Sequence, residues 1–509
     1  MRSISMSPRS VLILLFTGLL LTGCFCLAGS SSADAFGLFG FGRGGFGHPG
    51  MAPRLPAPRF GGGYPGRPPG WGGGPGRYAP PIVGGGAVVG GSVAGRAASG
   101  GGGSGGNHSN SSHNNSNNNG GNATPVAQNN LPYIADELIT AFAPDTPQQA
   151  IAQFARRYDL TQIETQNFPL IGTSLYRWRV GGGRSVASVI NAAGGENIVA
   201  GVQPNYIYTL QQAAAPQASA GDAAQYALGA LQGDTAHQFA TGKDVLVAVI
   251  DSEIDTAHPD LAATVVKSFD ALTGSETPHL HGTEMAGAIA AHGKLSSIAP
   301  EAHILAAHAF DDSPGIARGN SFAIYKGLQW AADNGARIVN MSFAGPADPT
   351  LRRLIAAAYD KNIVLIAAAG NAGPQSEPLY PAADPNVIAV TATDSDGHVY
   401  KMANRGRYIA VAAPGVDIIA LAPGGGYQLS TGTSIAAAHV SGIAALLLER
   451  KPSLKPADIR AILIATAKAP GPPTADADFG AGVVSAYRAL TALNHTAGDD
   501  KGENAQAKQ

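Results

Sequence analysis

Cysteine is nearly absent from this sequence. Its 509 residues include two cysteines, Cys24 and Cys26, both near the N-terminus. No disulfide can therefore brace the rest of the chain, and no cysteine-based metal site can form there. Charge is also scarce: 13% of the residues are charged and the net charge is −2. Nothing in this balance attracts the chain to nucleic acid. We expect about two to four domains, stabilised by packing alone.

The N-terminal apolar run, Val11–Leu21, is too short to span a membrane as a helix and is typical of an export signal. It ends in Leu21-Thr22-Gly23-Cys24, which resembles the bacterial lipobox. This resemblance implies a signal over residues 1–23 and a lipid on Cys24, and thus a lipoprotein of the outer membrane or periplasmic side, held to the membrane through Cys24. The alternative is cleavage at Ala33-Asp34-Ala35, which gives a secreted extracellular protein.

Residues 24–125 are dominated by glycine, proline, asparagine and serine. The whole chain has 68 glycines and 35 prolines, an excess that usually means that part of a chain does not fold. The stretch lacks the strict three-residue period of collagen. It also offers little apolar surface to offset the conformational entropy of folding. We expect a disordered tether here, and a disordered polar tail over residues 494–509.

Regular structure is expected from residue 131 onward. Residues 131–210 show strand-like and helix-like patterns, such as the helix Gln148–Tyr158, in the strand, helix, strand, strand, helix, strand order of a small ferredoxin-like α+β domain. Near its end the pattern predicts two short strands, Asn197–Val202 and Tyr206–Leu210. A link rich in alanine, glutamine and serine follows over residues 211–225 and should be accessible to cleavage.

The body of the chain, residues 226–493, alternates short apolar strands with longer helices. Val245–Ile250 and Ile338–Met341 are continuous apolar strands, and Phe322–Asn334 is one of the helices between strands. This alternation predicts an α/β domain in which a parallel sheet is sandwiched by helices. Side chains that carry chemistry should then lie at the carboxyl ends of the strands.

Four residues of the body fit one catalytic scheme. Asp251 ends an apolar strand, where a lone carboxylate is costly unless it is hydrogen-bonded, and His281 and Ser434 each open a helix. A serine hydroxyl becomes a nucleophile when a histidine accepts its proton and a carboxylate holds the imidazole. Asn371, in a glycine-hinged turn, can supply an oxyanion donor together with the N–H of Ser434. We predict these roles for the four residues.

The segments around these residues resemble the signatures of the subtilisin-like serine proteases. They read VAVIDSEIDTAHPDL from Val247, HGTEMAGAIAA from His281 and GTSIAAAHVSGIAALL from Gly432. The chain order Asp, His, Ser is also that of subtilisin. The resemblance implies a serine endopeptidase that hydrolyses peptide bonds in proteins or peptides and requires no cofactor. Family members often bind structural calcium, for which the sequence assigns no site.

Other segments resemble further parts of this family. Residues 131–210 resemble the inhibitory propeptide, which implies a zymogen that binds its own propeptide and processes itself within residues 211–225. Leu379 stands where members with deep pockets often carry Gly. We therefore expect that the first pocket, which binds the side chain of the substrate residue before the cleaved bond, is shallow and favours small or modest apolar side chains. The segment IVNMSFAG from Ile338 resembles the strand that lines the substrate. This assigns substrate contacts to Ser342, Phe343, Ala344 and Gly345.

Three positions depart from the family pattern. Ala438 stands where Pro is frequent, and Ala suits a helix. Glu253 stands where Gly is usual, and it would be strained if the position required a positive φ. Glu284 replaces a common second His, one turn beyond His281. Either it caps the helix as a first-turn carboxylate, or it stabilises the imidazolium and raises the pKa of His281. Strain at Glu253 is the one feature that favours a rival function, a non-catalytic scaffold that binds peptides without cutting them.

Overall fold

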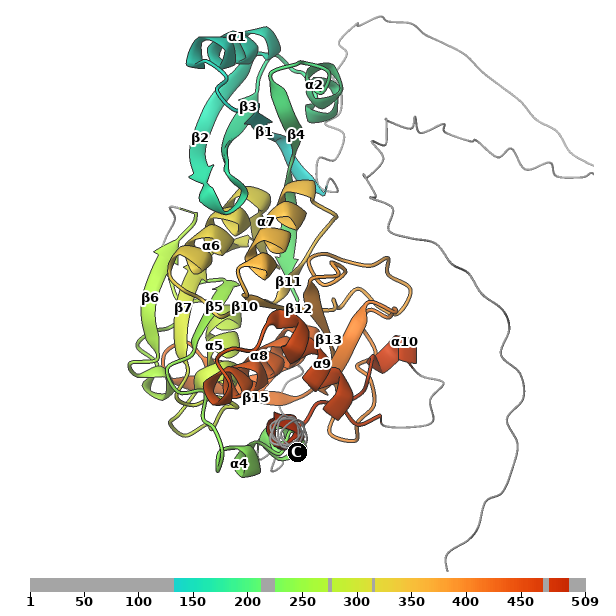
Figure 1. Ribbon diagram of the computed structural model, residues 1–509. Helices are drawn as coiled ribbons and strands as arrows, with labels where there is room; N and C mark the ends of the chain where they lie inside the picture. Colours follow the sequence, from blue (N-terminus) through green and yellow to red (C-terminus); the bar gives the residue numbers. More distant parts are fainter. Residues whose placement is uncertain (1–131, 212–224, 273–276, 314–315, 470–475, 494–509) are drawn as a thin grey trace, which may run out of the picture. The chain divides into compact units, whose positions relative to one another are not determined.

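The computed structural model describes residues 132–211, 225–272, 277–313, 316–469 and 476–493 (Figure 1). All of them belong to the same unit of the chain, residues 115–509. The expected signal, tether and tail, and the lipidation site Cys24, lie outside the described residues. None of the helices in the described ranges is long and apolar enough to cross a membrane.

Residues 132–211 form a small domain with the ferredoxin-like order of elements. The strands lie in the order β2-β3-β1-β4 and pair antiparallel. Helix α1 packs on this sheet because Ile151, Phe154 and Tyr158 follow the helical repeat and form one apolar face. The elements are β1 (Tyr133–Phe142), α1 (Gln148–Tyr158), β2 (Leu160–Phe168), η2 (Pro169–Ile171), β3 (Thr173–Val180), α2 (Val186–Ala193) and β4 (Val199–Leu210).

The end of the small domain differs from the prediction. Instead of two short strands, the structure has one continuous strand, β4. Pro204 and Asn205 interrupt the apolar pattern of the sequence. Asn205 is nevertheless fully buried, and its amide donates a hydrogen bond to Glu137 at 2.8 Å, so tertiary contacts hold the strand together. β4 also leaves the domain: it pairs antiparallel with β9 (Ile316–Asn320) and with β11 (Phe343–Ala344).

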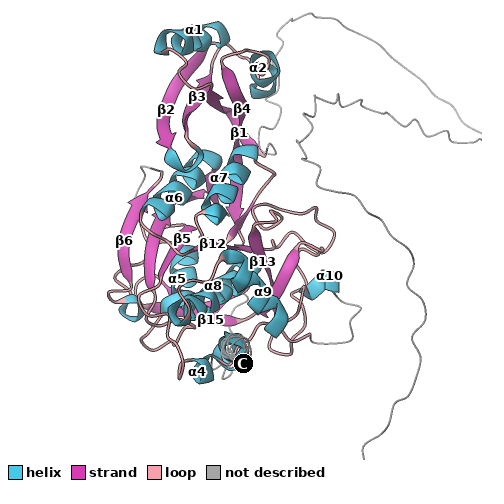
Figure 2. Ribbon diagram, in the orientation of Figure 1, coloured by secondary structure: helices cyan, strands magenta, loops and turns pink. Residues whose placement is uncertain are grey.

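Residues 225–493 form a large domain built on a seven-stranded parallel sheet, in the order β14-β13-β12-β10-β5-β7-β6 (Figure 2). Apolar side chains point to both faces: Val247 and Val249 of β5 enter one core, whereas Ala248 and Ile250 enter the core on the opposite face. The strands are β5 (Leu246–Asp251), β6 (Val265–Asp270), β7 (His303–His308), β10 (Ile338–Met341), β12 (Val364–Ala368), β13 (Val387–Thr393) and β14 (Ile409–Pro414).

Helices cover both faces of this sheet, which confirms the predicted sandwich. Helices α5 and α8 contribute to the core that contains Val247, and α6 and α7 contribute to the core that contains Ala248. The helices are α3 (Tyr226–Ala230), α4 (Gly233–Ala236), α5 (Leu280–Ala290), α6 (Ser321–Asp333), α7 (Pro349–Asp360), α8 (Thr433–Arg450), α9 (Pro456–Thr466) and α10 (Asp476–Phe479). A short turn, η3 (Pro259–Leu261), and the strands β8 (Phe310–Ser313), β15 (Ile418–Ala422) and β16 (Gly426–Ser430) complete the domain.

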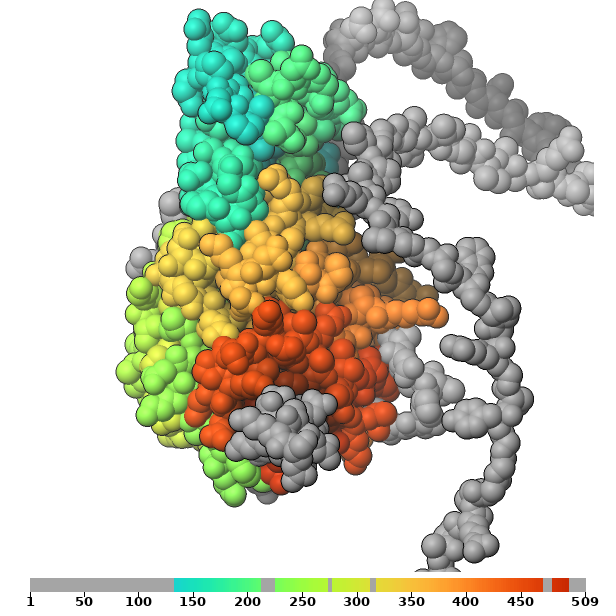
Figure 3. Space-filling model, in the orientation of Figure 1, coloured from blue at the N-terminus to red at the C-terminus, as the bar shows by residue number. Residues whose placement is uncertain are grey.

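The two domains are in contact beyond β4. Helices α6 and α7 lie against the small domain (Figure 3). Lys326 of α6 donates to Glu164 of β2 at 2.8 Å, and the N–H of Leu170 donates to Gln329 Oε1 at 2.9 Å. The small domain is therefore joined to the large domain by side-chain contacts as well as by a strand.

The order of the strands changes direction beside β5. After β5 the chain adds β6 and β7 on one side and then returns to add β10, β12, β13 and β14 on the other side. At such a point the connections at the carboxyl ends of the strands diverge and leave a crevice. Asp251 ends β5 and Ser342 follows β10, so both residues lie at this crevice.

Candidate active site

Asp251 and His281 form a buried hydrogen-bonded pair. Asp251 is the last residue of β5, His281 lies in the first turn of α5, and both are fully buried. His281 Nδ1 donates to Asp251 Oδ1 at 2.7 Å. The N–H of Ser252 donates to the same oxygen at 2.8 Å, which helps to fix the carboxylate. This arrangement leaves Nε2 of His281 as the ring atom that can exchange a proton with another group.

The pKa of His281 reflects a balance between burial and charge. Burial disfavours the imidazolium. The charge of Asp251, its hydrogen bond and the charge of Glu284 favour it more strongly, so the pKa of His281 lies above its ordinary value. The imidazole of His281 can therefore take up a proton during a reaction, because Asp251 stabilises the imidazolium and keeps the ring in position.

Two residues that the sequence patterns did not single out hold the start of α5. His279 precedes the helix, and its Nδ1 accepts from the N–H of His281 at 3.3 Å. Ser252 Oγ accepts from the N–H of Gly282 at 3.0 Å. Gly282 is required here, because a Cβ would meet the carbonyl oxygen of Ser252 at 2.2 Å. The sequence signals for Ser252 and His279 are their positions: Ser252 directly follows Asp251 at the end of the strand, and His279 lies two residues before His281.

Ser434 lies in the first turn of α8 and contacts the end of β4. Its Oγ donates to the carbonyl oxygen of Gln211 at 2.5 Å and lies 3.2 Å from the carbonyl oxygen of Ser342. Nε2 of His281 has no hydrogen-bond partner among the described residues. The hydroxyl of Ser434 therefore donates to the Gln211 carbonyl here and not to His281.

The side-chain amide of Asn371 points at the same carbonyl group. Asn371 Nδ2 donates to the carbonyl oxygen of Gln211 at 2.7 Å. The orientation of the amide is fixed because its Oδ1 accepts from the N–H and the Oγ1 of Thr433, at 3.1 and 2.9 Å. Gly370 allows the turn before it, with a φ of +112°. One carbonyl oxygen thus accepts from the Asn371 amide, the kind of donor that stabilises an oxyanion, and the same carbonyl group lies beside the serine hydroxyl.

The last residues of β4 run along the predicted substrate-binding residues. The N–H of Gln211 donates to the carbonyl oxygen of Ser342 at 3.2 Å. Gly345 makes room for the ring of Tyr208, which a Cβ at this position would meet at 2.4 Å. Between these two contacts the chains pair antiparallel. The pairs are Phe343 with Leu210 and Ala344 with Thr209.

Leu379 is the fifth predicted substrate-binding residue. Among the described residues, no hydrogen bond links it to Gln211. Leu379 is half-buried, and its carbonyl oxygen accepts from the N–H of Ala383 at 3.0 Å. The side chain of Gln211 turns back toward its own strand, where its Nε2 donates to the carbonyl oxygen of Thr209 at 3.0 Å. Its Oε1 accepts from the N–H of Asn371, across the groove, at 2.8 Å. The depth of the first pocket stays a prediction.

Glu253 has an ordinary backbone conformation. It is not among the non-glycine residues with positive φ in the described ranges, so this position does not impose the strain that Glu would meet there. Its carbonyl oxygen accepts from the N–H of His279 at 2.8 Å, and its carboxylate lies 3.5 Å from Nδ1 of His308. Among the described residues, no group of three or more His, Cys, Asp or Glu side chains could hold a metal ion. Structural calcium therefore stays unassigned.

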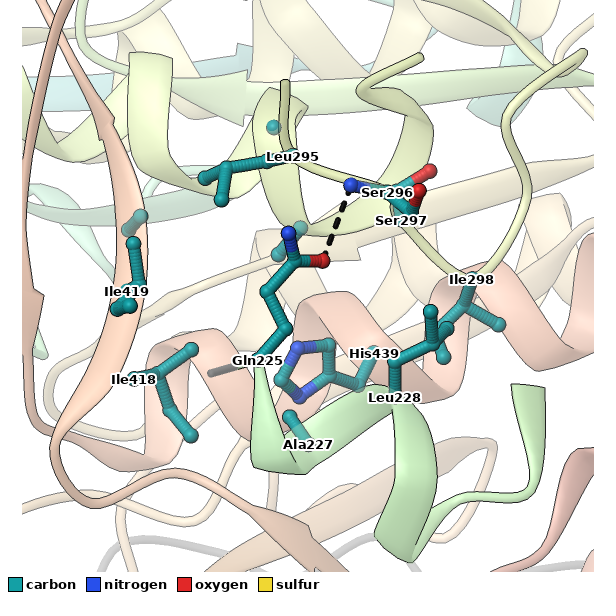
Figure 4. Close-up of a pocket in the computed structure, with 13 residues that line it drawn as sticks. Gln225, Ala227, Leu228, Leu295, Ser296, Ser297, Ile298, Ile418, Ile419 and His439 are labelled. Atoms are coloured by element: carbon teal, nitrogen blue, oxygen red, sulfur yellow. Dashed lines mark hydrogen bonds between the residues drawn. The ribbon is translucent and has the colours of Figure 1, made fainter. Parts of the chain in front are cut away.

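The described chain resumes at Gln225, which is anchored beside a small cavity of about 40 Å³. Gln225 Oε1 accepts from the N–H of Ser296 at 3.0 Å (Figure 4). His439 of α8 lines the same cavity, and its Nδ1 donates to the carbonyl oxygen of Pro414 at 3.0 Å. The chain is therefore held at Gln211 and again at Gln225, on the two sides of residues 212–224.

A buried Asp–His pair, together with a serine hydroxyl and an amide donor on one carbonyl oxygen, defines a site of the serine hydrolase class. Residues 242–482 match the model of the Subtilase family. Thermitase of Thermoactinomyces vulgaris is 35% identical over 275 residues, which cover 52% of this chain and 95% of thermitase. This chain belongs to the subtilase family and is a subtilisin-like serine endopeptidase.

Other relatives are matched over less of their length. Subtilisin E of Bacillus subtilis (strain 168) is 39% identical over 239 residues, which cover 45% of this chain and 61% of that protein. Fervidolysin of Fervidobacterium pennivorans is 34% identical over 265 residues, and the match spans 38% of its length. The crystal structure of fervidolysin, described as a keratinolytic enzyme related to subtilisin, has a TM-score of 0.61 at 25% identity and covers 70% of this chain and 61% of that chain.

Proposed function

We propose that Ser434 attacks the peptide bond, with His281 as general base, Asp251 as the residue that holds the imidazole and Asn371 as oxyanion donor. The proton of Ser434 Oγ passes to Nε2 of His281 and is later given to the leaving amine. The developing oxyanion accepts from Asn371 Nδ2 and from the N–H of Ser434, which lies in the first turn of α8 where N–H groups lack helical acceptors. The hydrogen bond between His281 and Asp251 supports these roles.

We further propose that the chain is made as a zymogen and cuts itself between Gln211 and Gln212. One observation carries this proposal: the carbonyl oxygen of Gln211 lies 2.5 Å from Ser434 Oγ and 2.7 Å from Asn371 Nδ2. Residues 132–211 act as the propeptide, and their last strand fills the groove until it is released. The cut falls at the start of the predicted processing link.

Intact mass of two purified proteins, residues 125–509 and the same protein with Ser434→Ala, tests both proposals. We expect the first to yield fragments that end at Gln211 and begin at Gln212, and the Ser434→Ala protein to stay whole. Ser441→Ala, on the same helix, is the matched control and should be cut like the parent. A parent that stays whole and is not labelled by a serine-directed fluorophosphonate would overturn the catalytic roles. Labelling without the cut would overturn the self-processing alone.

The substrates are proteins or peptides, and we infer that the first pocket is shallow, with Leu379 at its base. The turned-back side chain of Gln211 supports a pocket that the side chain does not enter deeply. We also propose export, as a lipoprotein tethered through Cys24 or as a secreted protein. Intact mass of the N-terminal fragment that ends at Gln211, recovered from the source of the protein, distinguishes the two, because a diacylated Cys24 adds the mass of the lipid to this fragment. The rival function, a non-cutting scaffold, depended on strain at Glu253, and no observation now favours it.

A further inference from the structure

A second carboxylate is buried one helical turn beyond His281. Glu284 lies three residues after the histidine on α5, and its side chain is fully buried. Side chains three residues apart on a helix are neighbours, with Cβ atoms about 5–6 Å apart. Burial of a carboxylate is unfavourable, and here the buried carboxylate is a helical neighbour of the His281 imidazole. Burial accordingly raises the pKa of Glu284 to about 7.

Helix capping does not account for Glu284. The cap of α5 is His279, whose side chain accepts from the N–H of His281, and the first turn contains no acidic residue. The carboxylate of Glu284 is directed instead at β16, where Ser430 Oγ and Gln428 Nε2 donate to it at 3.0 and 3.2 Å. Both donors are neutral, so they stabilise the carboxylate without cancelling its charge.

Glu284 and His281 act on each other through their charges. The charge of His281 lowers the pKa of Glu284 and the charge of Asp251 raises it, and the charge of Glu284 in turn raises the pKa of His281. Two carboxylates, one on β5 and one on α5, therefore act on one imidazole. The titratable side chains on the elements that pack against α5 or bond to Glu284 are Asp251 on β5, His303 and His308 on β7, His258 and Asp260 at η3, Tyr427 on β16, and His439, Glu449 and Arg450 on α8.

We propose that Glu284 is a positioning residue that acts through His281: its buried negative charge favours the imidazolium that forms when His281 takes the proton of Ser434. The proposal rests on the proposed role of His281 as general base. Asp251 stabilises the imidazolium through a hydrogen bond, and Glu284 stabilises it through space. The same effect makes His281 more basic in the resting enzyme, so its base form is lost at a higher pH as the solution is acidified.

The test is the pH dependence of kcat/KM for a peptide p-nitroanilide, measured on the processed enzyme and on its Glu284→Gln variant. The substitution keeps the shape of the side chain and removes its charge. We expect the acid limb of the variant to move to lower pH by up to about one unit. An opposite charge at this range shifts a pKa by about 1–3 units, and the shift is at the low end because Glu284 itself takes up a proton near pH 7. We also expect the plateau kcat to fall several-fold with an unchanged KM, because the lost interaction is made only in the transition state.

Two further variants keep the test sharp. Glu449→Gln makes the same chemical change on α8, where the carboxylate accepts from the N–H groups of Thr241 and Gly242 at 2.7 and 2.6 Å, and its acid limb should match the parent. Ser430→Ala removes one donor and so disfavours the ionised form of Glu284. It should shift the acid limb in the same direction by less, and it serves if Glu284→Gln does not fold.

The outcomes separate this proposal from the proposed function. An inactive parent enzyme overturns the catalytic role of His281, on which both depend. An active parent whose acid limb is unchanged in Glu284→Gln overturns the role of Glu284 alone. NMR titration of the His281 ring in the Ser434→Ala protein provides the same comparison without turnover, and an equal midpoint with and without Glu284→Gln also overturns the proposal.

Discussion

Orientation of single side chains decides what the site can do. The amide of Asn371 is turned by Thr433 so that its nitrogen, and not its oxygen, faces the carbonyl of Gln211. Sequence spacing predicts that an Asn lies in a glycine-hinged turn. It does not predict which atom faces the site, because that choice depends on a donor at the start of another helix.

Leu379 is the residue from which we argue substrate preference. If its side chain fills the base of the first pocket, Leu379→Gly opens space for an aromatic ring. We expect the ratio of kcat/KM for peptide anilides ending in Phe to those ending in Ala to rise by about 10- to 100-fold, which corresponds to a few methylene contacts. Glu377→Gly, an exposed position two residues earlier in the same loop, should leave the ratio unchanged. A parent enzyme that already cuts Phe or Leu anilides far faster than Ala anilides would contradict a shallow pocket.

At the scale of elements, the sequence predicts the parallel sheet and both catalytic helices, because their apolar periods are strong and uninterrupted. His281 and Ser434 lie at the starts of α5 and α8, as their patterns indicate. β4 is different. Its buried polar residues Gln203 and Asn205 find partners on the large domain, and a pattern based on apolar spacing cannot represent such contacts. The apolar pattern therefore predicts two short strands, whereas the structure has one continuous strand.

Helix α8 carries a histidine that makes the fold sensitive to acid. Burial lowers the pKa of His439 to about 4, although its hydrogen bond to the carbonyl of Pro414 opposes this. The unfolded chain therefore binds a proton at about pH 6.5 and the folded chain does not. The free energy of unfolding should fall as the pH decreases from about 6.5 to 4, by about 3 kcal/mol in total from this group.

Urea unfolding of the Ser434→Ala protein at a series of pH values measures this effect. His439→Gln, which retains an N–H donor, should remove about 3 kcal/mol from the loss of stability between pH 6.5 and 4. His398→Gln is the matched control, because the side chain of His398 is 76% exposed, and it should leave the slope as it is. Equal slopes in all three proteins would show that another group causes the loss.

At the scale of the whole molecule, the small domain is bound at its last strand and at a buried polar cluster. Gln203 of β4 reaches the residue that caps α7: its Nε2 donates to Asp348 Oδ1 at 2.8 Å, and its Oε1 accepts from Thr350 Oγ1 at 2.7 Å. Asp348 also accepts from the N–H groups that begin the helix. The cluster does not depend on Gln211, so the small domain keeps most of its contacts after the chain is cut.

Processing and activation should therefore be separate events in time. We expect the cut after Gln211 to precede the rise of peptidase activity, because the cut small domain still fills the groove. Gln203→Ala removes one donor to Asp348 and leaves Thr350 Oγ1 without its acceptor when the domain is bound. The cost is about 1–3 kcal/mol, so the small domain should bind about 5- to 150-fold more weakly and the lag should be shorter. Time courses of intact mass and of anilide hydrolysis measure the two events, with the exposed Gln162→Ala as control. Activity that rises together with the cut in the parent protein would show that the small domain does not inhibit once it is cleaved.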